Sequence, residues 1–389
     1  MKKIMIFVNS YVARQGNIGF RTEKILNHIH SIKSDCKVTC FCRGYDLNHT
    51  GVRYVSLGIL GYFQRFLNAF RIYVAPNFNV RVIDIKLFEW YCLLRLWFEP
   101  DSDQKFVAHV WEYCPSLIKR LKSLGGYVVL DVPIAPSTFS ERIRKSKGVD
   151  FLNVYNTLVE LELESFHLAD LIISPSKFVK QELVYAGIDH NKIMIVNFGV
   201  DSILSDLKIA ESKDSTEVEG INFCFFGLVN KRKGIHDLLQ VWDSLDFDSD
   251  RLHLCGRVYP EIINEIRVLK DKGVSNIITP GFVNPQSYMK MCDVFVFPSW
   301  MEGSSKAIFE AMSMGLPCIV TESSGSVVRD GIDGFVIDAG DTKALREKML
   351  WFKSNRYQIT LMGDSARENV RSFTWEVYAR NVIKLYGFD

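Results

Sequence analysis

The chain has 389 residues, of which 48% are hydrophobic and 24% are charged. This composition excludes a largely disordered protein, and the length exceeds what one hydrophobic core usually organises, so two domains are expected. The formal net charge is only +2, and we expect no nucleic-acid partner.

The charge is unevenly divided along the chain. Residues 1–200 hold 25 Lys and Arg against 18 Asp and Glu, whereas the remainder holds 22 against 27. A basic N-terminal half indicates an anionic partner there, such as a phosphate-bearing acceptor or an acidic membrane surface. Uneven solvation of an ordinary surface explains the same numbers equally well.

The nine cysteines show no repeated Cys-x-x-Cys or Cys/His spacing. Such a set predicts a reducing compartment and no metal site. The apolar run at 4–8 is ended by Asn9 and Ser10, so it is too short for a signal peptide. No apolar stretch of about 18 residues occurs, and we therefore expect a cytoplasmic protein without a membrane span.

Strand-like apolar runs alternate with helical patterns throughout, which is typical of parallel βαβ units. The strands predicted in the first part are 4–8, 38–42, 106–110, 127–130, 171–173 and 193–196, and those in the second part are 222–226, 251–254, 276–278, 294–297 and 318–320. The fold class is therefore α/β, with two Rossmann-like, doubly wound parallel sheets that face a cleft.

A polar and charged stretch at 202–220 has little apolar periodicity, and we place the interdomain linker there. The predicted domains are residues 1–201, which would bind the acceptor, and residues 221–370, which would bind a nucleotide sugar. Residues 371–389 are predicted to form a C-terminal helix that packs back on the first domain.

Aromatic and basic residues are interleaved between Phe63 and Phe98. This pattern suits an amphipathic surface that lies on anionic lipid. It suits aromatic core helices with solvated arginines somewhat better, because core packing is the commoner use of such periodicity.

The first candidate site follows the apolar run at 222–226. Gly227 is succeeded by the basic residues Lys231, Arg232 and Lys233, and then by a helical pattern. A strand, a short basic loop and a helix N-terminus together offer amides, a dipole and cations to a phosphate. A solvated basic loop is the alternative.

The second candidate site follows the apolar run at 294–297. Glu302 and Gly303 precede Ser304 and Ser305, which open a helix that carries Glu310 eight residues after Glu302. The glycine permits close approach to a ligand, and two glutamates at this separation can contact different parts of one elongated molecule. Singly, each glutamate would be read as a solvated helix residue, and Ser305 as a cap.

Taken together, these motifs resemble the retaining glycosyltransferases of family 4, which have the GT-B fold. The resemblance covers most of residues 220–345 and rests on several motifs in order, namely the loop from Gly227 to Gly234, Gly256, Gly281-Phe282-Val283, Pro298-Ser299, Glu302, Glu310-Ala311-Met312, Gly315-Leu316-Pro317, Gly325 and Asp330-Gly331-x-x-Gly334. The chain departs from the family at Leu228, where an arginine is common, so phosphate binding would depend on Lys233 with Arg232 or Lys231.

The resemblance implies a role for each matching residue. Lys233 and Arg232 would hold the donor diphosphate, together with the loop that begins at Gly227. Glu302 would bind hydroxyls of the transferred sugar, and Glu310 would accept hydrogen bonds from the ribose. The remaining matches are the amides of Gly303, Ser304 and Ser305 at the sugar and phosphate, Phe282 and Val283 at the base, and His109 at the sugar as a third catalytic residue beside Glu302 and Lys233.

The resemblance thus implies a metal-independent hexosyltransferase that needs no cofactor and uses a nucleotide sugar, with UDP-sugars favoured over GDP-sugars. The acceptor would be a saccharide, and a lipid-linked saccharide on the inner face of the membrane in cell-surface polysaccharide biosynthesis fits the charge division. Two other readings remain open: a phosphorylase or epimerase with the same architecture, and a non-catalytic scaffold that binds nucleotide sugar or lipid.

Overall fold

The computed structural model describes residues 2–12, 18–32, 36–46, 49, 51–58, 61, 80–98, 105–150, 155–201, 220–245 and 249–387. The chain forms two compact units. Unit 1 comprises Met1–Val196 together with Tyr378–Asp389, and unit 2 comprises Asn197–Val377. The predicted linker falls on residues that lie outside the described ranges, apart from Gly220.

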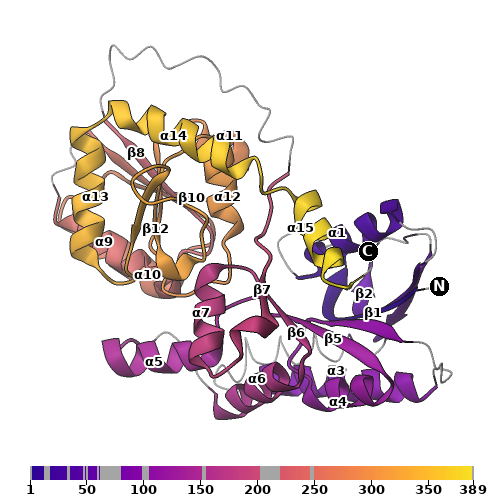
Figure 1. Cartoon of the computed structure of the whole chain (residues 1–389). Helices are drawn as coiled ribbons and strands as arrows, with labels where there is room; N and C mark the ends of the chain where they lie inside the picture. Colours follow the sequence, from indigo (N-terminus) through magenta and orange to yellow (C-terminus); the bar gives the residue numbers. More distant parts are fainter. Residues whose placement is uncertain are drawn as a thin grey trace. The chain divides into compact units, whose positions relative to one another are not determined.

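Unit 1 is built on a seven-stranded sheet in which all neighbouring strands run parallel, in the order β3-β2-β1-β4-β5-β6-β7 (Figure 1). Its strands are β1 (Lys2–Val12), β2 (Cys36–Tyr45), β3 (Val52–Ser56), β4 (Phe106–Val110), β5 (Gly126–Asp131), β6 (Leu171–Ser174) and β7 (Ile193–Ile195). The central strands read as continuous apolar runs because both faces of a parallel sheet are covered.

The helices of unit 1 are α1 (Ile18–Ile32), α3 (Val80–Trp97), α4 (Pro115–Ser123), α5 (Ser137–Lys147), α6 (Asn156–Leu168), α7 (Lys177–Tyr185) and the short η1 (His190–Lys192). Helices α3, α4 and α6 lie along one face of the sheet, where α4 packs against both of the others (Figure 1). Helix α1 packs against β1.

Unit 2 is built on a six-stranded parallel sheet in the order β10-β9-β8-β11-β12-β13. Its strands are β8 (Asn222–Phe226), β9 (Arg251–Cys255), β10 (Ile277–Gly281), β11 (Val294–Phe297), β12 (Cys318–Thr321) and β13 (Gly334–Ile337). The aromatic residues Phe223, Phe225, Phe295 and Phe297 of the two central strands are fully buried and form the middle of its core.

The helices of unit 2 are α9 (Ile235–Asp243), α10 (Pro260–Asp271), α11 (Pro285–Met289), α12 (Lys306–Ser313), α13 (Thr342–Ser354) and α14 (Tyr357–Val370), with the 3₁₀ turns η2 (Lys231–Lys233) and η3 (Glu322–Ser324). Helix α9 packs against α10 and α13, and α12 packs against α11 and α14 (Figure 1). The last helix, α15 (Trp375–Lys384), begins in unit 2 and continues into unit 1.

Both sheets have the strand order of dinucleotide-binding folds, in which the direction of winding reverses beside the first strand. The reversal lies between β1 and β4 in unit 1 and between β8 and β11 in unit 2. Ligands of open α/β sheets bind at the carboxyl ends of the strands at such a point. The predicted α/β architecture with two doubly wound sheets is confirmed.

Two strands were not predicted, and both have physical reasons for escaping a search for apolar runs. Edge strand β3 is half exposed, and β13 is a short strand that begins with a glycine. No helix in the described part of the chain is both long and apolar enough to cross a membrane.

Candidate functional site

The loop that follows β8 carries the predicted basic residues. Its η2 turn is capped by Asn230, whose side-chain oxygen accepts a hydrogen bond from the Lys233 amide at 3.1 Å. Gly234 ends the turn with φ +70°, and a Cβ there would lie 1.9 Å from the Pro298 carbonyl oxygen. Only glycine allows this approach, which joins the β8 loop to the β11 loop at the winding reversal.

The loop that follows β11 is fixed by short polar side chains. The Ser299 carbonyl accepts hydrogen bonds from the hydroxyls of Thr321 and Ser323, at 2.5 and 2.8 Å. The Glu302 amide donates to the Ser323 carbonyl at 2.9 Å, and the Trp300 amide donates to the carbonyl of Arg232 at the same distance. The backbone of this loop is therefore held from two sides, by η3 and by η2.

One oxygen of Glu302 collects the polar groups of both loops. Its Oε1 lies 2.6 Å from Lys233 Nζ and 2.6 Å from Arg232 Nη1, and Ser299 donates its hydroxyl to the same atom at 3.1 Å. The Lys233 and Glu302 side chains are only 11% and 13% exposed. Two cations that share one carboxylate leave this site with an excess positive charge beside a strand end.

This environment determines the charge of the site. Burial alone would raise the pKa of the Glu302 carboxyl, but Lys233 and Arg232 outweigh burial and hold that pKa below its usual value. The Lys233 ammonium also lies 4.7 Å from the centre of the Phe297 ring, within cation–π range. Glu302 is therefore ionised at neutral pH, and the cations remain available to an anion that competes for them.

A buried brace supports this pair of loops from behind. Trp300 is 4% exposed and donates its indole N–H to a carboxylate oxygen of Asp237 on α9 at 2.7 Å. The Trp300 ring also closes against Gly340, where a Cβ would lie 2.3 Å from the ring. Because the Trp300 amide is bonded to Arg232, the brace fixes both loops at once.

The N-terminus of α12 lies directly after Glu302. Gly303, Ser304 and Ser305 are buried, and Ser305 occupies the N-cap position without using its side chain as a cap. The hydroxyl oxygen of Ser304 is buried and has no hydrogen-bond partner among the described residues. On the same helix, Glu310 is ion-paired with Lys306 at 2.9 Å. A helix N-terminus with an unsatisfied hydroxyl is suited to an anionic or polyhydroxy ligand.

Close backbone contacts also shape the neighbouring strand ends. A Cβ on Gly256 would lie 1.9 Å from the Gly227 carbonyl oxygen, so the loops after β8 and β9 touch through backbone alone. Phe282, which follows β10, is 81% exposed. Val283 packs against the core of unit 2. The aromatic ring of this predicted pair is thus the member open to a ligand.

His109 belongs to unit 1, on β4 beside the winding reversal of that sheet. Its side chain is fully buried, and its Nδ1 lies 2.8 Å from the Tyr386 hydroxyl. Its Nε2 lies 3.6 Å from Asp131, and its ring packs 4.9 Å from that of Trp111. The last residues of the chain thereby hold this imidazole in place, and a role at the sugar remains a prediction.

A second polar group lies at the carboxyl ends of β1, β2 and β4. Arg43 is bonded to Asn9 at 3.1 Å and to Asp84 at 3.0 Å, and Arg81 is paired with Glu112 at 2.8 Å. Arg81 is 41% exposed on the side-chain atoms, whereas Glu112 is 2% exposed. This edge of unit 1 therefore presents a guanidinium whose counter-charge lies beneath it.

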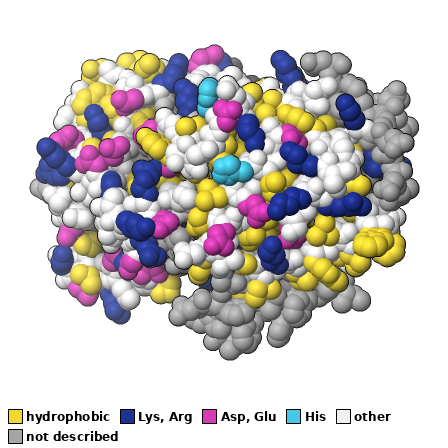
Figure 2. All heavy atoms as spheres, turned by 60° about the horizontal axis from the view of Figure 1, so that its bottom comes forward, with side chains coloured by type: hydrophobic (Ala, Val, Ile, Leu, Met, Phe, Trp, Pro, Cys, Tyr) yellow, Lys and Arg dark blue, Asp and Glu magenta, His cyan; other side chains and the backbone are white. Residues whose placement is uncertain are grey.

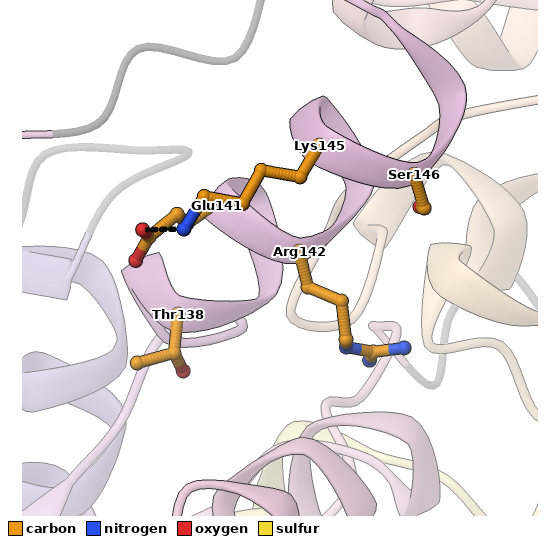
Figure 3. A pocket seen from close by; sticks show the side chains of 5 residues that line it. All are labelled: Thr138, Glu141, Arg142, Lys145 and Ser146. Atoms are coloured by element: carbon orange, nitrogen blue, oxygen red, sulfur yellow. Dashed lines mark hydrogen bonds and ion pairs between the residues drawn. The ribbon is translucent and has the colours of Figure 1, made fainter.

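A hollow of about 470 Å³ lies on α5, and none of the predicted site residues lines it. Its lining residues are Thr138, Glu141, Arg142, Lys145 and Ser146 (Figure 3). Its charged residues already have partners, since Lys145 is paired with Glu141 at 2.6 Å and Arg142 with Glu182. The hollow is lined by a single helix, so we assign it no role.

Of the predicted site residues, the structure brings Arg232, Lys233 and Glu302 into one cluster and places Gly303, Ser304 and Ser305 directly after it. Phe282, Val283 and Glu310 lie on neighbouring elements of unit 2, and His109 lies in unit 1.

Ser299 and the Asp237–Trp300 pair were not predicted as site residues. A serine at the carboxyl end of a buried strand was a usable signal, whereas the brace depends on a contact 63 residues apart. In the described ranges, no group of three or more His, Cys, Asp or Glu could hold a metal ion.

Residues 220–355 match the family model described as "Glycosyl transferases group 1". The chain is 28% identical over 222 residues to an uncharacterized glycosyltransferase of Methanocaldococcus jannaschii, covering 56% of this chain and 59% of the relative. It is 25% identical over 261 residues to the capsular polysaccharide biosynthesis glycosyltransferase CapM of Staphylococcus aureus, covering 63% and 68%. A shorter match, 49% identical over 55 residues and 14% of each chain, is to the UDP-Gal:alpha-D-GlcNAc-diphosphoundecaprenol alpha-1,3-galactosyltransferase of Escherichia coli.

Solved structures share the fold over the whole chain. Sucrose-phosphate synthase from Thermosynechococcus elongatus superposes with a TM-score of 0.71 at 15% identity, covering 100% of this chain and 98% of that one. Anabaena HepE in complex with UDP-glucose superposes with a TM-score of 0.64 at 14% identity, covering 100% of each chain. The predicted GT-B fold is confirmed, and the predicted family is confirmed for residues 220–355, the part of the chain that the family model matches.

Proposed function

We propose, from the match of residues 220–355 to the group 1 glycosyl transferases (family 4), that the chain transfers a sugar, with retention, from a UDP-sugar to a lipid-linked saccharide. The observation that carries the donor half is the cluster of Lys233 and Arg232 on one oxygen of Glu302. It lies at the winding reversal of unit 2, where a nucleotide is expected.

Lys233 and Arg232 bind the donor diphosphate by exchanging part of their contact with Glu302 for phosphate oxygens. The amides at the start of α12 add hydrogen bonds, and the ligand supplies the partner that the Ser304 hydroxyl lacks among the described residues. Glu302, once partly released, accepts hydrogen bonds from hydroxyls of the sugar. Glu310 binds the ribose, and Phe282 lies against the base, where its exposed ring offers a stacking surface.

The reaction breaks the bond between the anomeric carbon and the diphosphate. Negative charge then develops on the leaving oxygen, where fixed cations and amides stabilise it in the transition state more than in the ground state. The acceptor hydroxyl attacks from the face that the leaving group vacates, and its proton passes to a leaving phosphate oxygen. We propose that no metal is required, because Lys233 and Arg232 supply the positive charge.

The choice of UDP and of a lipid-linked acceptor is supported by two similar proteins. The short Escherichia coli match is named for UDP-galactose and a diphosphoundecaprenol-linked sugar, and the Anabaena structure holds UDP-glucose. In unit 1, Arg81, whose side chain is partly exposed and is paired with Glu112, would meet the anionic part of such an acceptor. We further propose that the enzyme works at the cytoplasmic face of the membrane in polysaccharide biosynthesis.

The test is calorimetric titration with UDP-, GDP-, ADP- and CMP-sugars, with and without EDTA, followed by a transfer assay on undecaprenyl-diphosphate-linked sugars. We expect selective UDP-sugar binding that EDTA does not change, and a product whose anomeric configuration, read by NMR, matches that of the donor. Selective binding of a GDP-sugar would overturn the donor assignment, and loss of activity in EDTA would overturn metal independence. Binding without transfer to any acceptor would favour a non-catalytic scaffold.

A further inference from the structure

Helix α3 of unit 1 carries large apolar side chains on two faces. The inner face is formed by Ile85, Phe88, Cys92 and Leu96, which are at most 3% exposed. The outer face is formed by Ile83, Trp90, Leu94 and Trp97, which are 38, 55, 42 and 82% exposed, and Phe98 beyond the helix end is 75% exposed. A water-facing helix surface is normally polar, so this outer face requires an explanation.

The acidic and basic residues of α3 also lie on different sides of the helix. Both acidic residues point inward and are bonded: Asp84 is paired with Arg43, and Glu89 accepts the backbone amides of Ser116 and Leu117. Among the exposed residues of the helix, the charged ones are Lys86 and Arg95, and both are basic. The outer face therefore combines tryptophan, aliphatic and basic side chains, of which Lys86 reaches the buried Glu89 at 3.0 Å.

We propose that the outer face of α3, together with Phe98, rests in the interface of an anionic lipid bilayer. Tryptophan is enriched at membrane interfaces because its ring is apolar and its N–H remains near water. Apolar area and cations contribute jointly to such binding, and each basic residue near an anionic surface strengthens it by about fivefold. The layer of α3, α4 and α6 lies at the bottom of Figure 1, and that side comes forward in Figure 2, where hydrophobic, basic and acidic side chains all reach the surface.

A second copy of the chain fits this surface less well. In a twofold dimer the same patch meets itself, so Lys86 and Arg95 of one copy would face those of the other. Like charges at a desolvated interface oppose association. An anionic bilayer complements these cations, and we therefore assign the outer face to a bilayer.

The inference deepens the proposed function and rests on it for its setting, since an acceptor with a lipid tail is held in a bilayer. Within the aromatic and basic stretch, one helix carries both a packed aromatic face and an exposed one. Phe88 and Tyr91 pack into unit 1, whereas Trp90 and Trp97 face outward. Residues 63–79 of that stretch lie outside the described residues.

The test uses the full chain and vesicles that contain no acceptor, so that binding is measured apart from catalysis. We expect flotation with phosphatidylglycerol vesicles at low salt, weaker flotation at high salt or with phosphatidylcholine alone, and quenching of tryptophan emission by brominated lipid. The Trp90→Ala/Trp97→Ala variant should bind vesicles at least about tenfold more weakly and lose most of the quenching. Tyr357→Ala, which removes a 68% exposed aromatic side chain from unit 2, should bind like the parent.

Unchanged thermal unfolding and UDP-sugar binding would show that the double variant is folded. The proposal fails if the parent does not bind anionic vesicles, if the double variant binds them equally well, or if the parent is a dimer that the double variant dissociates. Transfer to a soluble acceptor analogue without vesicle binding would refute the surface and leave the proposed function standing. Vesicle binding without transfer to any acceptor would support the membrane surface and refute the proposed transfer reaction.

Discussion

Lys233 Nζ lies 2.6 Å from Glu302 Oε1, and both side chains are almost completely buried at the winding reversal of the unit 2 sheet. The two residues come from different loops, and Arg232 shares the same oxygen. The carboxylate thereby keeps two cations in place before an anion arrives. This preorganisation is the property that a site for a departing diphosphate needs.

Replacing Lys233 with alanine should lower kcat by about 10²–10³-fold, because one preorganised cation would be missing when charge develops on the diphosphate. Steady-state kinetics with the proposed UDP-sugar donor measures this loss. Lys231→Ala is the matched control, since it removes a cation from the same turn that is not among the described partners of Glu302. Equal losses in both variants would mean that the loop acts only through its overall charge.

Glu302→Gln should destabilise the ligand-free protein by about 3 kcal/mol, because it leaves two partly buried cations without their shared carboxylate. A nucleoside diphosphate would replace that negative charge. The rise in Tm on adding UDP should therefore be larger for this variant than for the parent, although transfer activity falls. Glu322→Gln, an exposed carboxylate nearby, should match the parent in both measurements. A smaller UDP-induced shift in Glu302→Gln would contradict this account of the cluster.

Two glycines with almost equal backbone angles separate steric from conformational effects. Gly234 has φ +70° and would place a Cβ 1.9 Å from the Pro298 carbonyl, whereas Gly331 has φ +72° and open space around it. Gly331→Ala should cost about 1–2 kcal/mol, as a left-handed alanine does, and leave UDP affinity unchanged. Gly234→Ala should cost clearly more and weaken UDP binding, because the two loops must separate. Denaturant unfolding and calorimetry test both expectations, and equal effects would show that the contact with Pro298 is unimportant.

Glu162 on α6 makes the stability of unit 1 depend on pH. It is 4% exposed, and burial raises its pKa to about 7, although the Ser137 amide and hydroxyl both donate to it. The folded-state pKa lies above the ordinary value, so the folded state binds the proton more tightly. The contribution of Glu162 to stability is therefore fully present below about pH 4.5, is lost as the pH rises from there to about 7, and changes no further above that pH.

Glu162→Gln cannot ionise, so it should gain stability relative to the parent by about 2 kcal/mol between about pH 5.5 and about pH 8. Urea unfolding at a series of pH values, followed through the tryptophans, measures the difference. Glu160→Gln, an exposed carboxylate on the same helix, should show no such trend. A difference for Glu162→Gln that stays constant with pH would contradict the raised pKa.

The Tyr386 hydroxyl holds His109 Nδ1 at 2.8 Å, and both groups are buried. Tyr386→Phe should therefore lower the free energy of unfolding by about 1–3 kcal/mol, since a buried imidazole nitrogen loses its partner. Tyr378→Phe is the comparison, because its bond to Asp131 is longer, at 3.4 Å, and its removal should cost less. The reverse order of the two variants in denaturant unfolding would contradict the assignment.

The sequence predicts those parts of the fold that depend on local chemistry. Residues 106–110, 222–226 and 294–297 are strands with the predicted bounds, because strands covered on both faces are uniformly apolar. The half-exposed β3 lacks that signal.

The same distinction applies to the site. The basic loop was predicted as a phosphate site from its own residues, and Glu302 was predicted as a donor-binding residue from the family resemblance. The contact between them was not predictable. Arg232 and Glu302 are 70 residues apart and meet only because β8 pairs with β11. The two faces of α3 likewise needed the packing of α4 to be told apart.

The chain leaves unit 1 once and returns to it once, and the two passages touch. Val200 pairs with Thr374 in a parallel bridge, and its amide donates to the Phe373 carbonyl at 3.0 Å. Unit 2 is therefore an insertion whose chain is paired with itself close to both of its ends. A gene fragment for residues 197–377 would encode a piece whose two ends lie close together, which could be expressed or circularised alone, so that nucleotide affinity could be measured in the absence of unit 1.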